Sequence, residues 1–248
     1  MYVLITGASS GLGKELALIL AKNNYNLILV ARRKNLLDQL KFTLEKNNID
    51  VIVKVTDLSK TENCFQLFKD LKEIKIDLLI NNAGFGNVGY FNETNLVTEL
   101  EMIDLNIKAV QILTKLYINN FEEGTVVNIS SLAAYLPTPI HATYSSTKSY
   151  VSFFSRAVNY ELKKQKKNVR VLTVAPGPIS TDFNQVAKAT KTRGMDSKKC
   201  ANIIYKGIVK RKEFIVPGFG MKLIYLLNHF IPTKLLMKIS HKIQSTKH

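Results

Sequence analysis

The first 23 residues combine an apolar strand, a glycine-rich turn and a helix, and this order restricts the chain to few folds. Val3–Thr6 is a short apolar run, and apolar residues at helical spacing run from about Gly13 to Asn23. Glycines let the backbone of the intervening turn approach a pyrophosphate, and the start of the helix offers unpaired N–H groups and a positive dipole end. The pattern predicts a dinucleotide site at Gly7, Ser9, Ser10, Gly11, Leu12 and Gly13.

Strand-like and helix-like stretches alternate through most of the remaining chain. The segments between the apolar runs are long enough for crossover helices, and repeated units of this kind form a parallel sheet with helices on both faces. We find no internal repeat, low-complexity tract or linker, so a single α/β domain over residues 1–248 is predicted. Further buried strands are expected near residues 27–31, 51–55, 78–80, 126–129 and 171–174.

The end of the second predicted strand indicates which dinucleotide is bound. An acidic residue at this place suits the ribose 2′-hydroxyl of NAD, whereas arginine suits a 2′-phosphate. Here Ala31 is followed by Arg32 and Arg33. Guanidinium groups match phosphate geometry, so NADP(H) is the predicted cofactor, with Arg32 and Arg33 in its site. The alternative is a pair of exposed arginines that cap a loop.

Four motifs in this order resemble the short-chain dehydrogenase/reductase family and cover residues 1 to about 182: Thr6-Gly7-x-x-x-Gly11-x-Gly13, Asn81-Asn82-Ala83-Gly84, Tyr144-x-x-x-Lys148 and Pro176-Gly177. The resemblance implies a doubly wound (Rossmann) sheet of seven strands. It also implies that Asp57 approaches the adenine, that Asn81–Gly84 lie along the cofactor and that Thr181 lies near the nicotinamide amide. The cofactor-binding residues expected on this basis are Asp57, Leu58, Asn81, Ala83, Gly84, Tyr144, Lys148, Pro176, Gly177 and Thr181.

Tyr144 and Lys148 are the central catalytic candidates. Their spacing of four residues places both on one face of a predicted helix. A free phenol has a pKa of about 10, too high for an efficient base near neutrality, and a nearby ammonium favours the phenolate. Tyr144 is therefore predicted to be the acid–base, and Lys148 to lower its pKa and hold the ribose.

Two further positions complete the catalytic set that the family resemblance implies. Ser131 stands thirteen residues before Tyr144, the family's separation for a catalytic serine, and its hydroxyl would bond the substrate oxygen. Ser130 is expected to have a structural role. Asn106 matches the position that anchors a proton-relaying water, and its assignment depends on the resemblance alone.

These residues favour an oxidoreductase that moves a hydride between nicotinamide and a carbonyl or secondary alcohol. A non-enzymatic NADP(H)-binding sensor or scaffold is the alternative, but such a protein needs no Ser131, Tyr144 and Lys148 together. No metal site is expected, since His229, His241 and His248 are too scattered for zinc ligation.

Charge and cysteine content bear on partners and compartment. The net charge of +16 is mostly lysine spread along the chain, without a recognisable base-reading module, so no nucleic-acid partner is expected. Cys64 and Cys200 read as ordinary thiols of a reduced, cytoplasmic protein, and no secretory signal is evident. The resemblance implies a homodimer or homotetramer, for which the long helix expected at 144–165 is suited.

A C-terminal extension from about 221 to 248 differs in character. It carries an apolar stripe that Pro232 interrupts, then a second stripe beside Lys234, Lys238 and Lys242. We expect helices packed on the domain, a substrate lid or a subunit interface, with contact to an anionic membrane surface as the alternative. The extension favours a hydrophobic ketone or alcohol as substrate, and the Phe85–Phe91 loop and residues 183–200 are expected near the substrate.

Overall fold

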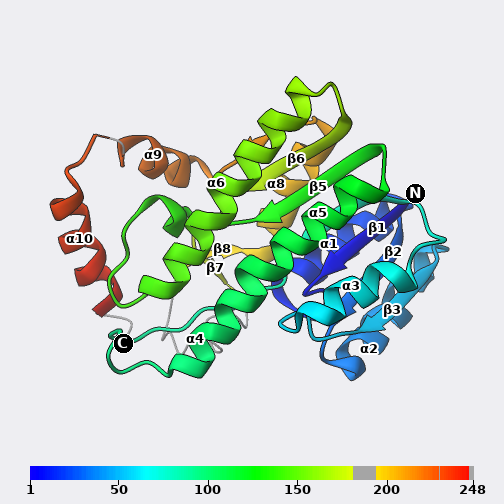
Figure 1. Ribbon diagram of the computed structural model, residues 1–248, viewed down its shortest axis with the longest axis horizontal. Helices are drawn as coiled ribbons and strands as arrows, with labels where there is room; N and C mark the ends of the chain where they lie inside the picture. The colour runs from blue at the N-terminus through cyan, green and yellow to red at the C-terminus, as the bar shows by residue number, and fades with distance from the viewer. Residues whose placement is uncertain (181–193, 229, 246–248) are drawn as a thin grey trace.

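Alternating apolar runs and helical segments build a seven-stranded parallel sheet covered by helices on both faces (Figure 1). The computed structural model describes residues 1–180, 194–228 and 230–245. In sheet order the strands are β3 (Val51–Val55), β2 (Asn26–Ala31), β1 (Tyr2–Thr6), β4 (Ile76–Asn81), β5 (Glu123–Ile129), β6 (Asn168–Val174) and β9 (Phe214–Ile215).

Two hydrophobic cores lie on opposite faces of this sheet. On one face, α1 (Gly11–Lys22), α2 (Lys34–Leu44) and α8 (Ser197–Val209) pack on residues such as Ile5 and Leu29. On the other face, α3 (Thr61–Asp70), α5 (Val110–Asn120) and α6 (Ala142–Lys164) pack on residues such as Leu4 and Ile28. Side chains of successive strand residues therefore point to alternate faces, and both faces are apolar because both are covered.

Strand order places the ligand-binding edge of the sheet. The chain passes from β1 to β2 and β3 on one side, and then crosses to β4, β5 and β6 on the other. In open parallel sheets, ligands bind outside the carboxyl ends of the strands at this reversal of direction. Many of the predicted site residues lie at or just after the carboxyl ends of β1, β2, β3, β4, β5 and β6, so the topology brings them to one edge.

The remaining elements are short or lie outside the sheet. A helical segment runs without a break through α4 (Leu96–Ile103), the π-helical η2 (Asp104–Ala109) and α5. Two residues each from β7 (Ile179–Ser180) and β8 (Met195–Asp196) form a separate small sheet. Short 3-10 helices occur at η1 (Glu45–Asn47) and η3 (Leu132–Tyr135).

The predicted doubly wound, seven-stranded sheet is confirmed, and the predicted strands each fall within an observed one. The expectation that residues 183–200 lie near the substrate falls mostly on residues 183–193, which lie outside the described residues. Cys200 belongs to α8 and is fully buried in the core, where it also lines a small apolar cavity. Cys64 is buried in the other core across the sheet, so the two thiols cannot pair.

The C-terminal extension forms two helices that stand away from the sheet, α9 (Phe219–Leu227) and α10 (Thr233–Ser245) (Figure 1). Among the described residues of these two helices, α9 has no fully buried residue and α10 has one, Ser240. The predicted apolar stripes are present, and most of their residues are exposed, whereas Ile231 and Leu236 are half-buried. No helix among the described residues is both long and apolar enough to cross a bilayer.

Candidate active site

The glycine-rich turn connects β1 to α1 with no room for larger side chains. Gly7 has a φ of +67°, a left-handed conformation that favours glycine, and a Cβ on it would lie 2.8 Å from the Cα of Ala83. A Cβ on Gly13 would lie 2.4 Å from the carbonyl oxygen of Gly7. Both glycines are therefore required for close packing of the turn on α1 and on the loop after β4.

The start of α1 is suited to an anion. Its N-cap residue, Ser10, makes no side-chain capping bond, and the first turn contains no acidic residue. The N–H groups of this turn and the positive end of the helix dipole consequently favour a negatively charged group. This arrangement fits a dinucleotide pyrophosphate beside Gly11, Leu12 and Gly13.

A polar clamp joins the glycine-rich turn to the loop after β4. The Thr6 hydroxyl accepts hydrogen bonds from the backbone N–H groups of Asn82 and Ala83, both at 3.0 Å. The Asn82 amide donates to the carbonyl oxygens of Thr6 at 3.0 Å and Gly7 at 3.2 Å. Thr6 and Asn82 therefore fix the two cofactor loops against each other. Thr6 and Asn82 both belong to motifs that carry the family resemblance, but the motifs alone do not indicate that these two side chains clamp the loops together.

The Arg33 guanidinium lies across the glycine-rich turn. It donates to the Ser9 hydroxyl at 2.9 Å and to the Ser10 hydroxyl at 2.6 Å. Arg33 is exposed, so the guanidinium can meet a phosphate from solvent. Arg32 is also exposed, at the end of β2. The structure therefore gives the two predicted arginines different surroundings, with Arg33 fixed on the turn.

Other predicted cofactor residues lie at the same edge, but some of their side chains serve the fold. The buried Asn81 amide donates to Asn128 at 2.8 Å and to Thr114 at 3.2 Å, which ties β4 to β5 and α5. The Leu58 side chain is buried in a core, and the Asp57 carboxylate accepts from Ser59. Asn81 and Leu58 can therefore reach a ligand only through their backbone.

Two predicted residues follow β6. The Pro176 carbonyl oxygen accepts from the Leu132 N–H at 2.8 Å, which holds the end of β6 beside η3. Gly177 lies against Met221 of α9. Thr181 lies outside the described residues, so its predicted contact with the nicotinamide amide stays a prediction.

Tyr144, Ser131 and Lys148 come together where β5 ends and α6 begins. A hydrogen bond joins the side chains of Tyr144 and Ser131. The Lys148 Nζ lies 5.9 Å from the centroid of the Tyr144 ring and donates to the Ile129 carbonyl oxygen at 3.0 Å. Ser130 donates to the Lys148 carbonyl oxygen at 2.7 Å, which confirms its structural role. The predicted hydroxyl pair and ammonium therefore share one small volume.

Burial controls the protonation of both titrating groups. It raises the pKa of Tyr144 to about 12, and the hydrogen bond with Ser131 only partly offsets this effect. It lowers the pKa of Lys148 to about 8. The predicted lowering of the Tyr144 pKa by Lys148 is thus not seen in the protein alone, because the ammonium lies beyond contact distance and desolvation dominates.

Asn106 joins the helix of η2 to the active site. It is fully buried, and its amide donates to the Phe85 carbonyl oxygen at 2.9 Å and to the Thr147 hydroxyl at 3.0 Å. Its Oδ1 accepts from the Phe85 N–H at 3.1 Å, and a Cβ on Gly84 would lie 2.8 Å from this oxygen and 3.3 Å from the Lys148 Nζ. Asn106 therefore lies beside Lys148 in a π-helical segment, a feature frequent at functional sites. Its role in anchoring a proton-relaying water stays a prediction.

A cavity of about 220 Å³ adjoins this site between the end of β6 and the start of α9. Its lining is apolar, apart from the backbone and a thiol. The lining residues are Pro176, Gly177, Pro178, Ile179, Met195, Cys200, Pro217, Gly218, Gly220 and Met221.

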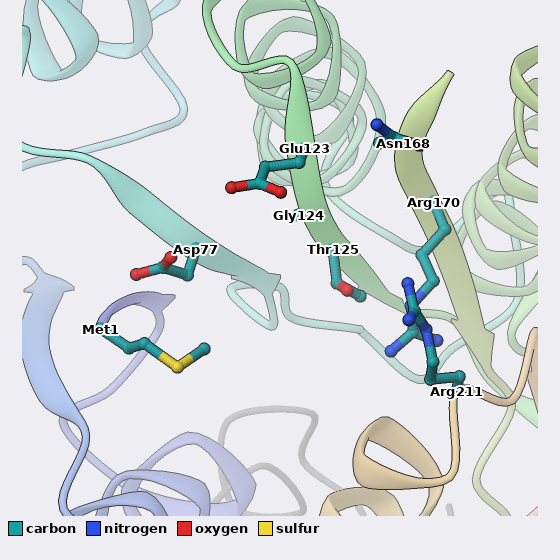
Figure 2. A pocket seen from close by; sticks show the side chains of 8 residues that line it. All are labelled: Met1, Asp77, Glu123, Gly124, Thr125, Asn168, Arg170 and Arg211. Carbon is teal, nitrogen blue, oxygen red and sulfur yellow. The ribbon is translucent and has the colours of Figure 1, made fainter. Parts of the chain in front are cut away.

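A larger cavity, about 500 Å³, opens at the opposite edge of the sheet (Figure 2). Asp77, Glu123 and Arg170, which line it, belong to the first residues of β4, β5 and β6. Because parallel strands start together at the amino edge, this cavity lies away from Tyr144 and Lys148. Its size is therefore no guide to the chemistry. Within the described ranges, no cluster of His, Cys, Asp or Glu could hold a metal ion.

Comparisons with known proteins agree with this geometry. The short chain dehydrogenase family matches residues 1–192. A curated relative, hydroxysteroid dehydrogenase-like protein 1 of Gallus gallus, is 32% identical over 77% of this chain and 60% of its own length. The very-long-chain 3-oxoacyl-CoA reductase of Anas platyrhynchos is 31% identical over 75% of this chain and 62% of its own length. The chain thus spans less than two thirds of these relatives.

A solved structure shows the same fold. A short-chain dehydrogenase from Sphingobium yanoikuyae, in complex with NADPH, has a TM-score of 0.83 and 30% identity, with 88% of each chain covered. The family match extends over most of the sheet and over every described catalytic candidate. The chain belongs to the short-chain dehydrogenase family, whose fold binds a nicotinamide cofactor.

Proposed function

We propose that this protein is an NADP(H)-dependent oxidoreductase that interconverts a carbonyl and a secondary alcohol. The observation that carries the proposal is the convergence of Ser131, Tyr144, Lys148 and Asn106 beside the glycine-rich turn. A sensor or scaffold on the same fold would need the turn but not this set of side chains. That alternative therefore leaves four clustered polar residues without a purpose.

The side chains divide the acid–base work. When bound, the nicotinamide supplies a hydride in reduction or accepts one in oxidation. Tyr144 donates its phenolic proton to the carbonyl oxygen as that oxygen gains negative charge. The Ser131 hydroxyl donates to the same oxygen and stabilises its charge. Since burial raises the pKa of Tyr144 to about 12, the phenol holds its proton at neutral pH, as the reducing direction requires.

Lys148 and Asn106 support this proton transfer. Lys148 is buried and fixed by the Ile129 carbonyl oxygen, so a cofactor ribose beside α6 would meet a positioned donor. An ammonium at this place favours the phenolate that forms when Tyr144 gives up its proton. Asn106 holds the backbone of Phe85 near Lys148, where a proton relay to solvent would start.

The preference for NADP(H) is supported by Arg33. Its guanidinium is fixed over the glycine-rich turn by Ser9 and Ser10, and the last residue of β2 is Ala31 rather than an acid. A 2′-phosphate at this position would gain charge-assisted hydrogen bonds and meet no repelling carboxylate. The relative from Sphingobium yanoikuyae is described in complex with NADPH.

A hydrophobic ketone or alcohol is the proposed substrate class. The cavity beside β6 is lined by proline, glycine, isoleucine and methionine, which favour an apolar ligand. The names of the two curated relatives refer to steroids and very-long-chain acyl groups, both apolar.

A ligand titration tests the cofactor proposal. NADPH should raise the unfolding temperature more than NADH does at equal concentration, because stabilisation follows affinity. Arg33→Ala should remove most of this difference, because it removes a charge-assisted contact with the 2′-phosphate. The affinity for NADPH relative to NADH should fall by about tenfold or more. Arg32→Ala should have the smaller effect, because Ser9 and Ser10 hold the Arg33 guanidinium on the turn whereas Arg32 is exposed after β2. Equal affinities for the two cofactors in the wild type would contradict the proposal.

A further inference from the structure

The two C-terminal helices contact the body through few, largely polar groups. On α9, Met221 packs against Gly177, the Tyr225 ring lies 4.7 Å from the Tyr135 ring, and the Asn228 amide donates to the Tyr135 carbonyl oxygen. These residues recur at helical spacing, so one narrow face of α9 docks on η3 and on the end of β6.

On α10 the docking face is more polar still. Ser240 is buried and Gln244 is half-buried, whereas the neighbouring Ile239 is exposed. A ring nitrogen of His241 lies 3.2 Å from the Tyr90 hydroxyl, which joins α10 to the loop after β4. Because α9 follows β9 and Tyr90 follows β4, both helices lie at the carboxyl edge of the sheet, the edge that holds Tyr144 (Figure 1).

Most of the remaining apolar side chains of both helices face outward, whereas Leu236 is half-buried on the docking side of α10. A surface helix of a globular protein normally turns its apolar stripe to the core and its polar face to water. Here the exposed fractions are 47% for Leu223, 57% for Leu226, 49% for Leu235 and 45% for Ile239. Phe219, the first residue of α9, is 86% exposed, and Phe230, in the segment between the two helices, is 83% exposed. We call this set of exposed apolar residues the tail face, and exposed apolar residues gathered in one part of a protein mark an interaction surface.

The charges around the tail face identify the partner. Lys222, Lys234, Lys238 and Lys242 are all exposed on the same two helices. No acidic residue follows Glu213 in the sequence, so nothing in the tail neutralises these lysines. Apolar residues beside uncompensated lysines suit the interface of an anionic bilayer. The apolar side chains enter the boundary of the acyl chains, and the lysines meet the lipid phosphates.

A second copy of the chain fits the tail face less well. In a symmetric dimer the same patch lies on both sides of the interface, so the lysines of one copy would face those of the other. A net charge of +16 adds to this repulsion and equally favours an anionic surface. The exposed residues of the tail face are not buried by the body of the protein, because α9 and α10 contact the body through their other faces.

We propose that α9 and α10 form a peripheral docking surface for anionic membranes and hold the carboxyl edge of the sheet against the bilayer. If the proposed function is correct, a hydrophobic substrate dissolved in the membrane would then reach the cavity beside Met221 directly. The docking itself does not depend on catalysis, so either proposal can fail alone.

Co-sedimentation of the full chain with vesicles tests the docking. Phosphatidylcholine vesicles with phosphatidylserine as roughly a third of the lipid should bind the protein at about 0.1 M salt, and binding should weaken at about 1 M salt. The triple variant Lys234→Gln, Lys238→Gln, Lys242→Gln should bind at least about tenfold more weakly. Pure phosphatidylcholine should bind less than the anionic vesicles do.

Two matched variants separate docking from general properties of the chain. The triple variant Lys22→Gln, Lys69→Gln, Lys167→Gln removes the same charge from exposed lysines at the other end of the molecule and should leave binding nearly unchanged. The double variant Leu235→Gln, Ile239→Gln should weaken binding by about tenfold or more, because it removes apolar area from the tail face. Glutamine favours the helix about as well as leucine does, so α10 should still form. Phe42→Gln with Phe65→Gln is its control, since both rings are exposed on α2 and α3.

Several results would overturn the proposal. The first is a wild type that does not sediment with anionic vesicles. The second is an equal loss in the two lysine triple variants, which would mean nonspecific attraction by net charge. The third concerns the double variant Leu235→Gln, Ile239→Gln. If this variant has a lower mass in solution than the wild type but binds vesicles equally well, the tail face is an interface with a second copy. Active but non-binding protein would refute docking alone, whereas binding without any turnover would count against only the proposed function.

Discussion

At the residue scale, the buried ammonium of Lys148 lowers the stability of the folded protein, and interactions elsewhere in the fold have to offset this loss. Lys148 is 5% exposed, and its Nζ has the Ile129 carbonyl oxygen as a hydrogen-bond acceptor. Burial lowers its pKa from 10.5 to about 8, which corresponds to about 3 kcal/mol of free energy of unfolding at neutral pH. This cost has no structural benefit, so it points to a functional requirement for the ammonium.

Replacing this lysine should stabilise the protein and inactivate it. Lys148→Met should raise the unfolding temperature of the cofactor-free protein at pH 7 by roughly 5 °C, because it removes the buried charge at the loss of one hydrogen bond. The exposed Lys164→Met on the same helix is the control and should change little. A lower unfolding temperature for Lys148→Met would contradict this account.

The same pKa shift fixes the sign of a pH effect. The folded protein binds fewer protons at Lys148 than the unfolded chain does between pH 8 and 10.5, so wild-type stability from this group rises with pH across that window. The advantage of Lys148→Met should therefore narrow between about pH 8 and about pH 10. Thermal unfolding of both proteins along a pH series measures it, and a gap that stays constant would show that the charge is not the cause.

At the element scale, η2 places Asn106 where an ordinary helix turn would not. The π-helical segment Asp104–Ala109 separates α4 from α5, and Asn106 within it binds both backbone groups of Phe85 and the Thr147 hydroxyl. One side chain thus connects the helix, the loop after β4 and α6. Its role in the site is to position the loop beside Lys148.

Removing this connection should affect rate more than cofactor affinity. Asn106→Ala should destabilise the fold by about 1–3 kcal/mol, since it leaves the backbone groups of Phe85 without their partner. It should also lower kcat by more than about tenfold with a smaller change in the KM for NADPH. Thr147→Val removes one of the three hydrogen bonds of Asn106, together with the bond that the Thr147 hydroxyl donates to the Tyr144 carbonyl oxygen within α6, and should have the smaller effect on both quantities. A loss of stability with unchanged kcat would make Asn106 purely structural.

Much of this arrangement could be predicted from the sequence, for a physical reason. The strands are apolar on both faces because helices cover both, so they stand out as continuous runs such as Leu27–Val30. The catalytic residues could be placed because they belong to short motifs fixed to strand and helix ends. Thr6 also belongs to a motif, but its role as a clamp could not be predicted, because that role arises from hydrogen bonds to residues 76 and 77 positions away.

The orientation of the tail was beyond sequence reasoning for a related reason. The stripes at Leu223 and Leu235 predict amphipathic helices, and both helices are present. Periodicity shows that a helix has two faces but not which face meets the body. That choice depends on contacts with Gly177, Tyr135 and Tyr90, all distant in the sequence. Of the possibilities expected for these helices, packing on the domain holds for one narrow face of each, and a lid, a subunit interface or membrane contact stays a prediction.

At the scale of the whole molecule, α6 presents a second exposed surface. Phe153 and Tyr160 are 62% and 61% exposed, and the Tyr150 hydroxyl reaches Gln111 of α5 beside them. Large aromatic residues on neighbouring long helices favour an interface between copies of the chain. The family resemblance led us to expect a homodimer or homotetramer through these helices, and this expectation stays a prediction.

Light scattering tests it. The wild type should have a mass of about twice or four times the 28.0 kDa of one chain. Phe153→Glu should reduce it to that of one chain, because two charges would be buried in a symmetric interface. Phe42→Glu introduces the same charge on the exposed face of α2 and should leave the mass unchanged. A single-chain mass for the wild type would refute this assembly.

The most direct test of the catalytic assignment compares the wild type with Tyr144→Phe in NADPH-dependent reduction of a panel of steroid, long-chain and small polar ketones. We predict that the wild type turns over hydrophobic ketones, and that Tyr144→Phe loses about 10²–10⁴-fold in kcat while NADPH still raises its unfolding temperature. Comparable turnover by Tyr144→Phe would contradict the assignment of the acid. A wild type that binds NADPH but reduces no ketone would contradict the proposed function and favour a sensor on the same fold.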